Sequence, residues 1–510
     1  METEIKLKAH PNDLPAVMDA LSAAAALEFP PKIKHLESRY FDTPDRHLAG
    51  QKVALRVRKT DEGYIQTLKT AADAGSTLFA RGEWESPVET FSPCLDDQMQ
   101  VLSPEVLANL GLLFTTDIER QKFIATYPRY RPNATRIEIA FDSGVIRSNG
   151  QEQSVSEVEL ELLDGKASDV LDLALRLAEQ LPLQLETDSK SARGYRLADN
   201  EIPKGVRAEA LNFIPEVSLE DGMRESLRAC IRQWFDNQSG AFDGRDIEGV
   251  HQMRVALRRL RSALVFFGDF IGEPPLGGFK EDAKWAAGSL GPARDWDVFL
   301  AETLPPVTDG WVGHDGLRAL EESAWQIRET GYETARVAMM SPRYTAFALR
   351  ISSWIERAGW RSGLDKAQVK RMAAPMSDLA GQLLDRRYAK VLKLGRKFDR
   401  MSREDRHELR IVLKRLRYAG DFFRSLYPKD KVKPFRGPMT DMLEKLGHMN
   451  DLTVAEHLCA VLLERGGQNR ERVESGVAAL LSWHEAHGAV AESAMRETWR
   501  AFCVADPYWR

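Results

Sequence analysis

The first 200 residues alternate polar and apolar side chains in short runs. Residues 52–59 read KVALRVRK, residues 64–70 read YIQTLKT and residues 155–163 read VSEVELELL. Residues 2–8, 81–85 and 137–142 show the same alternation. A period of two predicts β-strands, and the Asp, Gly and Pro residues between the runs predict turns. We therefore predict an antiparallel sheet, interrupted by helices at about residues 11–26 and 166–181.

The polar face of these six runs carries mainly Arg, Lys and Glu, with few of the Ser, Thr and Gln residues expected on a solvated face. Charges on a single strand are usually explained by contact with water. Repeated over six strands, the pattern favours a closed tunnel with a charged lumen. The opposite, apolar face would then pack against helices.

From residue 219 onward the pattern is helical, and it contains an internal duplication. Residues 251–267 read HQMRVALRRLRSALVFF, and residues 407–423, 156 positions later, read HELRIVLKRLRYAGDFF. The repeat predicts two helical bundles, at about residues 219–372 and 373–510. We expect a first domain over residues 1–200, a Pro- and Gly-containing linker over 201–218, and an all-α domain over 219–510.

Each copy of the repeat places a histidine and three cations on one helix face, at positions i, i+3, i+7 and i+10. These residues are His251, Arg254, Arg258 and Arg261 in the first copy, and His407, Arg410, Lys414 and Arg417 in the second. A second basic stripe comprises Arg386, Lys390, Lys393 and Lys397. A charge run is usually a solvated face, but like charges on one stripe repel unless an anion lies there.

A bare phosphate chain fits these stripes better than a nucleic acid, because no aromatic residues interleave with the cations to stack on bases. A single His–Arg pair at i, i+3 offers no chelate. We therefore expect the two histidines to contact phosphate or to make a structural hydrogen bond, rather than to bind a metal.

The charge is distributed unevenly along the 510 residues. The net charge is −5 overall, with −9 in residues 1–200 and +4 in residues 201–510. An acidic first part and a basic second part suggest different roles, and the near-neutral total argues against a general nucleic-acid binder. The four cysteines are scattered, and neither a signal peptide nor a run of eighteen apolar residues is present, so we expect a cytoplasmic protein without membrane spans.

The N-terminal strands carry the two kinds of group that phosphoryl transfer needs. Alternating carboxylates on two strands suit a shared Mg²⁺ ion; they are Glu2, Glu4, Glu157, Glu159 and Glu161. Opposing cations suit a chain of phosphates; they are Lys6, Arg56, Arg58, Lys69, Arg81 and Arg120. There is no Gly-rich phosphate loop, so the site would be built from side chains.

These residues follow the order of a known family. Glu2-x-Glu4-x-Lys6 resembles the ExExK signature of the CYTH superfamily, also called triphosphate tunnel metalloenzymes. Glu4-x-Lys6-x-Lys8 is an alternative alignment, but it requires a substitution in the signature. The resemblance continues through Tyr40-Phe41-Asp42-Thr43, Leu55-Arg56-x-Arg58, Thr67-Leu68-Lys69, Arg81-x-Glu83-x-Glu85, Arg120, Glu138, Asp142-x-Gly144, Glu157-x-Glu159-x-Glu161 and Ser189-Lys190-x-x-Arg193-Gly194-Tyr195.

The resemblance implies an eight-stranded antiparallel tunnel that hydrolyses or cyclises triphosphate compounds with Mg²⁺ or Mn²⁺. It implies catalytic roles for Glu2, Glu4 and Lys6, and metal binding by Glu2, Glu4, Glu157, Glu159 and Glu161. The triphosphate-binding residues would be Lys6, Arg56, Arg58, Lys69, Arg81, Arg120 and Lys190. Glu83, Glu85, Glu138 and Asp142 would instead orient the cations.

The C-terminal half resembles the CHAD domain, a duplicated helical domain that often follows CYTH. The resemblance rests on the two repeated helices, on Arg294-Asp295-x-Asp297 and on Asn450-Asp451. It implies binding of inorganic polyphosphate by the two basic helix faces and by the Arg386, Lys390 and Lys393 stripe. Because Asn450 replaces Arg294 and Thr453 replaces Asp297 in the second copy, the two halves need not bind equally.

The expected protein is an α+β multidomain enzyme, an inorganic triphosphatase with tripolyphosphate as substrate and polyphosphate as a further ligand. The alternatives are a nucleotide or thiamine triphosphatase or an adenylate cyclase of the same fold, or a polyphosphate-binding scaffold without activity. The absence of an evident aromatic base clamp disfavours a nucleotide substrate, and the complete set of carboxylates disfavours the scaffold.

Overall fold

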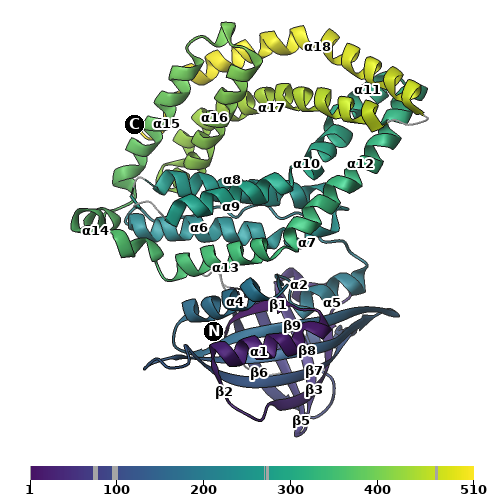
Figure 1. Cartoon of the computed structure of the whole chain (residues 1–510), viewed down its shortest axis with the longest axis vertical. Coiled ribbons are helices and arrows are strands. Elements are labelled where there is room, and N and C mark those ends of the chain that lie inside the picture. The colour runs from purple at the N-terminus through teal and green to yellow at the C-terminus, as the bar shows by residue number, and fades with distance from the viewer. Residues whose placement is uncertain (1, 73–78, 95–101, 269, 272–274, 466–468) are drawn as a thin grey trace. The chain divides into compact units, whose positions relative to one another are not determined.

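The computed structural model describes residues 2–72, 79–94, 102–268, 270–271, 275–465 and 469–510 (Figure 1). The chain forms two compact units. The first unit comprises Met1–Lys204, Gln238–Asp246 and Ala338–Gly359, and the second comprises Gly205–Asn237, Ile247–Val337 and Trp360–Arg510. Two segments from the helical half of the sequence therefore belong to the first unit.

The first unit is built on a closed antiparallel sheet. Its described strands are β1 (Glu2–Lys8), β2 (Ala26–Leu27), β3 (Lys32–Asp42), β4 (Val53–Thr60), β5 (Gly63–Ala72), β6 (Phe79–Val88), β7 (Gly111–Tyr127), β8 (Thr135–Ser148), β9 (Gln151–Asp164) and β10 (Gln184–Leu185). Their order is β10-β1-β6-β5-β4-β3-β7-β8-β9, with β2 paired to β7. The pairing of β1 with β9 closes eight long strands into a tunnel, as expected.

The outer face of this sheet is apolar and covered by helices. Ile5 and Leu7 on β1, and Val158 and Leu160 on β9, are at most 3% exposed. Helix α4 (Ala167–Gln180) packs against both strands and against α1 (Leu14–Ala24), in agreement with the two helices predicted from the sequence. Side chains alternate across a strand, so the neighbouring charged residues point to the lumen.

The remaining helices of the first unit are short, except for α13. They are η1 (Pro11–Asp13), α2 (His47–Gly50), α3 (Pro104–Ala108), α5 (Lys190–Asp199), α7 (Gln238–Asp243) and α13 (Pro342–Glu356). Helix α13 packs on α4.

Helix α5 is capped at its N-terminus by Ser189, whose hydroxyl accepts a hydrogen bond from the Ala192 N–H at 3.0 Å. A side chain at Gly194 would lie within 2.1 Å of the Phe114 ring, so this glycine allows α5 to lie close to β7.

The second unit is helical. Its elements are α6 (Leu219–Asp236), α8 (Ile247–Phe267), α9 (Pro275–Ser289), α10 (Gly291–Val298), η2 (Phe299–Thr303), α11 (Pro305–Gly310), α12 (Asp315–Met339), η3 (Gly359–Gly363), α14 (Lys366–Met372), α15 (Ser377–Gly395), η4 (Phe398–Arg400), α16 (Arg403–Phe423), η5 (Arg424–Leu426), α17 (Lys429–Arg465) and α18 (Arg470–Val504). Its chain enters through residues 201–217, which form no helix or strand.

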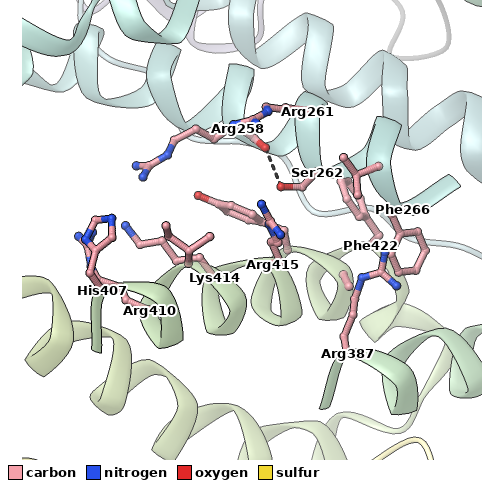
Figure 2. Close-up of a pocket in the computed structure, with 14 residues that line it drawn as sticks. Arg258, Arg261, Ser262, Phe266, Arg387, His407, Arg410, Lys414, Arg415 and Phe422 are labelled. Atoms are coloured by element: carbon pink, nitrogen blue, oxygen red, sulfur yellow. Dashed lines mark hydrogen bonds between the residues drawn. The ribbon is translucent and has the colours of Figure 1, made fainter. Parts of the chain in front are cut away.

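The sequence duplication is visible in the helices. Helices α8 and α16 have the same length and begin 156 positions apart, and Figure 2 shows them facing each other across a pocket. Helices α9 and α10 of the first copy correspond to the single helix α17 of the second. Pro292 lies at the start of α10, where the second copy has His448. Pro292 cannot donate the N–H that would continue α9, and the first copy breaks there, whereas α17 runs on through Pro434 and Pro438.

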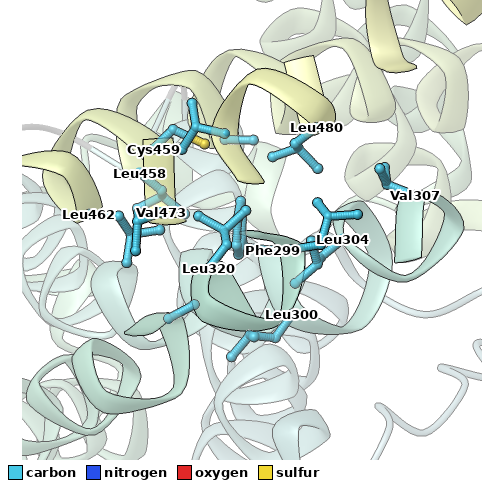
Figure 3. Close-up of a cluster of buried hydrophobic side chains, with 14 of the residues drawn as sticks. Phe299, Leu300, Leu304, Val307, Leu320, Leu458, Cys459, Leu462, Val473 and Leu480 are labelled. Atoms are coloured by element: carbon cyan, nitrogen blue, oxygen red, sulfur yellow. The ribbon is translucent and has the colours of Figure 1, made fainter. Parts of the chain in front are cut away.

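The two copies share a cluster of buried apolar side chains (Figure 3). Phe299, Leu304 and Leu320 of the first copy pack with Leu462 and Leu480 of the second. These five side chains are at most 1% exposed. The two copies therefore share this core, and their basic helices α8 and α16 contact each other separately.

The described helices contain no stretch long and apolar enough to cross a membrane. All four cysteines are free thiols: Cys94 and Cys503 are exposed, and Cys230 and Cys459 are buried.

Candidate functional site

The lumen of the sheet contains a cavity of about 590 Å³. Its described lining is Glu4, Lys6, Leu36, Tyr40, Arg56, Arg58, Lys69, Glu83, Glu85, Thr116, Ile118, Arg120, Lys122, Glu138, Asp142, Glu159, Glu161, Ser189, Lys190 and Ser191. These residues come from eight strands and from the start of α5. The tunnel thus collects charges that are widely separated in the sequence.

Carboxylates lie side by side on one wall of the cavity. Glu161 of β9 stands directly opposite Glu4 of β1 and directly opposite Glu138 of β8. Like charges placed opposite each other on adjacent strands are destabilising unless a cation lies nearby. Lys6 contacts Glu4 at 3.1 Å, and Lys122 contacts Glu138 at 2.5 Å.

A second acidic group is buried deeper, where Asp142, Glu157 and Glu159 offer oxygens within 4.8 Å of one another. The Lys190 ammonium contacts all three carboxylates, at 2.7 Å from Asp142 and 2.9 Å from Glu159. Burial acts to lower the pKa of Lys190, but the charges of Glu159 and Glu157 outweigh it and raise this pKa. Lys190 is therefore a permanent cation at the floor of the site.

Glu159 lies at the centre of the charge network. Its carboxylate contacts Lys6 at 3.0 Å, and it also pairs with Lys190 and Arg120. Burial acts to raise the pKa of Glu159, but the charges of Lys190, Lys6 and Arg120 hold it well below its usual range. Arg120 in turn binds Asp142 with two nitrogens, at 2.6 and 2.5 Å.

Strands β4 and β5 carry a further group of cations in the cavity, Arg56, Arg58 and Lys69. Glu83 bridges Arg56 at 3.2 Å and Lys69 at 2.9 Å. Arg58 donates a hydrogen bond to the Ser38 hydroxyl at 3.1 Å. Burial, followed by the charge of Arg56, lowers the pKa of Arg58 to about 9. These guanidinium groups repel each other in a buried place, and an anion in the cavity would relieve that repulsion.

Not all of the predicted tunnel residues can be placed. The side chains of Glu2 and Arg81 lie outside the described residues, although their backbones pair in the β1–β6 register. Glu157 does not belong to the described lining of the cavity, because its carboxylate is buried against Lys190 and Arg193. The other predicted triphosphate-binding residues, Lys6, Arg56, Arg58, Lys69, Arg120 and Lys190, all line the same cavity.

Two cations near the site received no role from the sequence. Lys122 lines the cavity two residues after Arg120, and strand alternation would have placed it on the same face. Arg193 contacts Glu157 at 2.6 Å and is 4% exposed. It follows Lys190 by three residues on α5, so helical spacing would have suggested that both reach the same acidic group.

The carboxylates suit a divalent metal ion. Oxygen donors alone are the ligand set that Mg²⁺ and Mn²⁺ prefer. The buried Asp142, Glu157 and Glu159 group is consistent with such an ion, and the row of Glu4, Glu161 and Glu138 offers a second set of oxygens.

The second unit has a cationic pocket of about 350 Å³ between the two copies of the repeat (Figure 2). It is lined by Arg258, Arg261, Ser262, Val265 and Phe266 of α8, by Arg387 of α15, and by His407, Arg410, Ile411, Lys414, Arg415, Tyr418, Ala419 and Phe422 of α16. Arg258, Lys414 and His407 converge at one end, and Phe266, Phe422 and Arg387 lie at the other. Parts of the two basic helix faces therefore line one pocket.

The cations around this pocket have few compensating charges. Burial, followed by the charge of Arg258, lowers the pKa of Lys414 to about 6. Burial and the charge of Arg294 lower the pKa of His251 to about 4. The Arg410 Nε has no hydrogen-bond partner among the described residues. His407 is hydrogen-bonded to the Asn450 amide oxygen at 2.7 Å, so this histidine has a structural contact of the expected kind.

Other predicted polyphosphate-binding residues lie outside the pocket lining. His251, Arg254 and Arg417 are on the same helices but do not line the described pocket, and Arg254 donates to the Ala287 carbonyl at 2.7 Å. Arg386, Lys390 and Lys393 are exposed on α15. The neighbouring Arg387 lines the pocket instead, with its guanidinium 4.1 Å from the centre of the Phe266 ring. Its role was not predicted.

The fold and the two charged sites define a CYTH-type tunnel domain joined to a duplicated helical domain. Family comparison agrees: the chain carries a CYTH domain over residues 1–195 and a CHAD domain over residues 225–460. The first is a triphosphatase-like domain with a buried acidic cluster.

Two of the relatives match one domain each, and a third spans both. An inorganic triphosphatase of Haemophilus influenzae is 33% identical over 170 residues, which are 33% of this chain and 47% of that protein. The alignment thus spans about half the length of this curated relative. The crystal structure of the CHAD domain from the plant Ricinus communis is 30% identical with a TM-score of 0.51, covering 58% of this chain and 96% of that one. An uncharacterised protein of Mycobacterium tuberculosis is 24% identical over 448 residues, 82% of each chain.

Proposed function

We propose that the tunnel hydrolyses inorganic triphosphate to pyrophosphate and phosphate with a divalent metal ion, and that the helical domain binds inorganic polyphosphate. The observation that carries the first part is the cavity of about 590 Å³, whose lining combines Lys and Arg side chains with a row of carboxylates. The relationship to an inorganic triphosphatase supports the same substrate class.

The cations bind the phosphate chain in this proposal. Arg56 and Arg58 of β4 and Lys69 of β5 hold one end, and Lys6, Arg120 and Lys190 hold the other. A guanidinium binds phosphate oxygens through paired N–H donors, which fixes the chain as well as neutralising it. Holding the reacting phosphate in line with a water supplies much of the rate enhancement in phosphoryl transfer.

The carboxylates hold the metal and orient the water. Glu4 and Glu161, with Glu159 beside them, present oxygens to the cavity. A bound Mg²⁺ or Mn²⁺ would neutralise charge on the phosphate oxygens. A carboxylate whose pKa is held low, such as that of Glu159, stays ionised at neutral pH and can serve as a ligand or accept a hydrogen bond from water.

The lining favours an inorganic substrate over a nucleotide. Tyr40 is the one aromatic residue in the described lining, and it is 6% exposed. Its ring stacks on Phe114, with centroids 4.4 Å apart. Among these residues a base could stack only on this one largely buried ring, one face of which Phe114 already covers.

The test is phosphate release from tripolyphosphate, ATP and thiamine triphosphate, with and without Mg²⁺ or Mn²⁺. We expect metal-dependent release from tripolyphosphate and its loss in Glu4→Ala. Glu152→Ala is the matched control, because Glu152 is exposed and pairs with Arg147 outside the tunnel. Preferential turnover of ATP or thiamine triphosphate would mean that the substrate is that compound and not tripolyphosphate. Turnover of none of the three would favour a binding scaffold without activity.

The second part of the proposal rests on the pocket between α8 and α16. It brings Arg258, Arg261, His407, Arg410 and Lys414 to one cavity from both copies of the repeat. A single phosphate chain lying between the copies would neutralise both helix faces at once. Polyphosphate thus replaces the missing counter-charges of the pocket.

Two single variants test which basic surface binds polyphosphate. Arg410→Met removes a pocket cation, whereas Lys390→Met removes an exposed cation of the α15 stripe. We expect the first to weaken polyphosphate binding at least tenfold and the second to change it little. The reverse result would place the chain on α15, and no binding by the unaltered protein would refute the second part of the proposal.

A further inference from the structure

Lys414 is the titratable member of a pair of equivalent residues. It lies 156 positions after Arg258, and the two side chains converge with His407 at one end of the pocket (Figure 2). An arginine keeps its charge at any accessible pH, whereas a lysine can lose its proton when it is buried among other cations. The second copy therefore carries a removable charge where the first copy has a permanent one.

The groups facing Lys414 are predominantly cationic. They are Arg258 of α8, His407, Arg410 and Arg417 of α16, and Asp451 of α17. Arg261 of α8 and Arg415 of α16 also line the pocket, and Arg387 of α15 lies at its other end. His251 of α8 is close enough for the charge of Lys414 to affect its titration. Burial, then Arg258, Arg410 and Arg417, lower the pKa of Lys414 to about 6, and Asp451 opposes them. At neutral pH the amine is mostly uncharged in the free pocket.

We propose that a phosphate chain entering this pocket takes up a proton on the Lys414 amine, so that the pocket binds polyphosphate more tightly as the pH falls. The proton comes from the solvent buffer, and no covalent bond changes. The inference rests on the proposed binding of polyphosphate and adds a pH dependence to it. Phosphate oxygens beside Lys414 favour the ammonium form over the amine, because they counter the repulsion from Arg258 and Arg410.

The direction and size of the change in polyphosphate affinity with pH follow from the linkage between binding and protonation. Between the free and bound pKa of Lys414, the complex holds up to one proton more than the separate partners. Its affinity then changes by up to about tenfold per pH unit. Below a pH of about 6 the free lysine is already protonated, so the affinity gains little more.

Calorimetry on the full-length protein measures the proton directly. Long-chain polyphosphate is titrated into protein in EDTA, which removes metal, at pH 7.5 in two buffers that differ in ionisation enthalpy. A long chain is the right probe, because its internal phosphates stay ionised and only its ends titrate. Lys414→Arg makes the second copy match the first, and Lys390→Arg makes the same change on the exposed α15 stripe as a control.

We expect Lys414→Arg to take up close to one proton fewer than the unaltered protein and Lys390→Arg, while still binding polyphosphate. Lys414→Met, neutral at every pH, should bind at least tenfold more weakly than the unaltered protein at pH 6, and the difference should narrow as the pH rises. Binding with equal proton uptake in the unaltered protein and Lys414→Arg would overturn this inference and leave polyphosphate binding standing. No binding by the unaltered protein would overturn both.

Discussion

Arg258 and Lys414, equivalent residues of the two repeats, point from α8 and α16 into the same pocket, where the charge of Arg258 acts on Lys414. The duplication thus places like charges opposite each other. Such an arrangement costs stability in the free protein and favours an anion between the helices.

This repulsion predicts opposite effects of one substitution on stability and on binding. Arg258→Met keeps the apolar stem and removes a charge that repels Arg410 and that disfavours the ammonium form of Lys414. We expect the free variant to be more stable by about 0.5 kcal/mol, as for the removal of like-charge neighbours on helices. Its polyphosphate affinity should fall at least tenfold. Denaturant unfolding without anion and binding by fluorescence or calorimetry measure the two quantities.

The matched control for Arg258→Met is Arg371→Met, which removes an exposed cation at the end of α14. It should change neither quantity. A loss of both stability and affinity in Arg258→Met would mean that Arg258 makes stabilising contacts in the free protein. Its charge would then not be an unfavourable one that only an anion relieves.

Glu159 predicts how the tunnel domain responds to acid. Its pKa is held well below the usual range by Lys190, Lys6 and Arg120, which outweigh the effect of burial. A carboxyl with a lower pKa in the folded state stabilises the fold above its unfolded pKa of about 4.3, and this stability is lost as the pH falls toward the folded value. We expect unfolding free energy to fall below about pH 4.5 and to fall less steeply in Glu159→Gln. Equal slopes in the two proteins would show that other carboxyl groups dominate the acid response.

The sequence predicted the tunnel and its lumen because a period of two reports which face of a strand is buried. The alternation in residues 52–59 and 155–163 corresponds to β4 and β9. Strands β3 and β7 were not predicted from the pattern, although the family resemblance implied eight strands. The first residues of β3 are exposed, so Lys32 and Lys34 give no burial signal there.

The sequence predicted that charged residues line the tunnel, but not which of them lie opposite each other on neighbouring strands. Spacing on one strand shows that Glu157, Glu159 and Glu161 share a face, whereas the register across β8 and β9 shows that Asp142 lies opposite Glu157. Asp142 consequently belongs to the buried acidic group with Glu157, and not only beside an arginine. Likewise, the duplication predicted two basic faces, but it does not reveal that they meet. That depends on how the helices pack.

Close packing of α12 against α18 predicts a position in the second unit where an added methyl group destabilises the fold. A side chain at Gly476 of α18 would lie 2.2 Å from the Gly316 carbonyl oxygen of α12, and one at Gly316 would lie 2.6 Å from the Gly476 nitrogen. Backbone atoms cannot move aside locally, so Gly476→Ala should destabilise the protein by about 1–3 kcal/mol. Gly437→Ala is the control, since nothing lies within 4 Å of its added methyl group and alanine favours helix by about 1 kcal/mol. Chemical denaturation compares them, and equal stabilities would contradict this packing.

The buried cations of the tunnel predict that its ligand stabilises the protein without any turnover. Burial and Arg56 lower the pKa of Arg58 to about 9, so its charge is unfavourable in the free cavity. Tripolyphosphate in EDTA should bind without being hydrolysed and, at a hundred times its dissociation constant, stabilise the domain by about 2.7 kcal/mol. Differential scanning calorimetry would show this as a higher unfolding temperature.

Arg58→Gln should raise the unfolding temperature of the free protein slightly and reduce the ligand-induced shift. The control is Arg131→Gln, which replaces an exposed arginine between β7 and β8 and should leave both quantities unchanged. An undiminished shift in Arg58→Gln would show that the phosphate chain is held without this guanidinium.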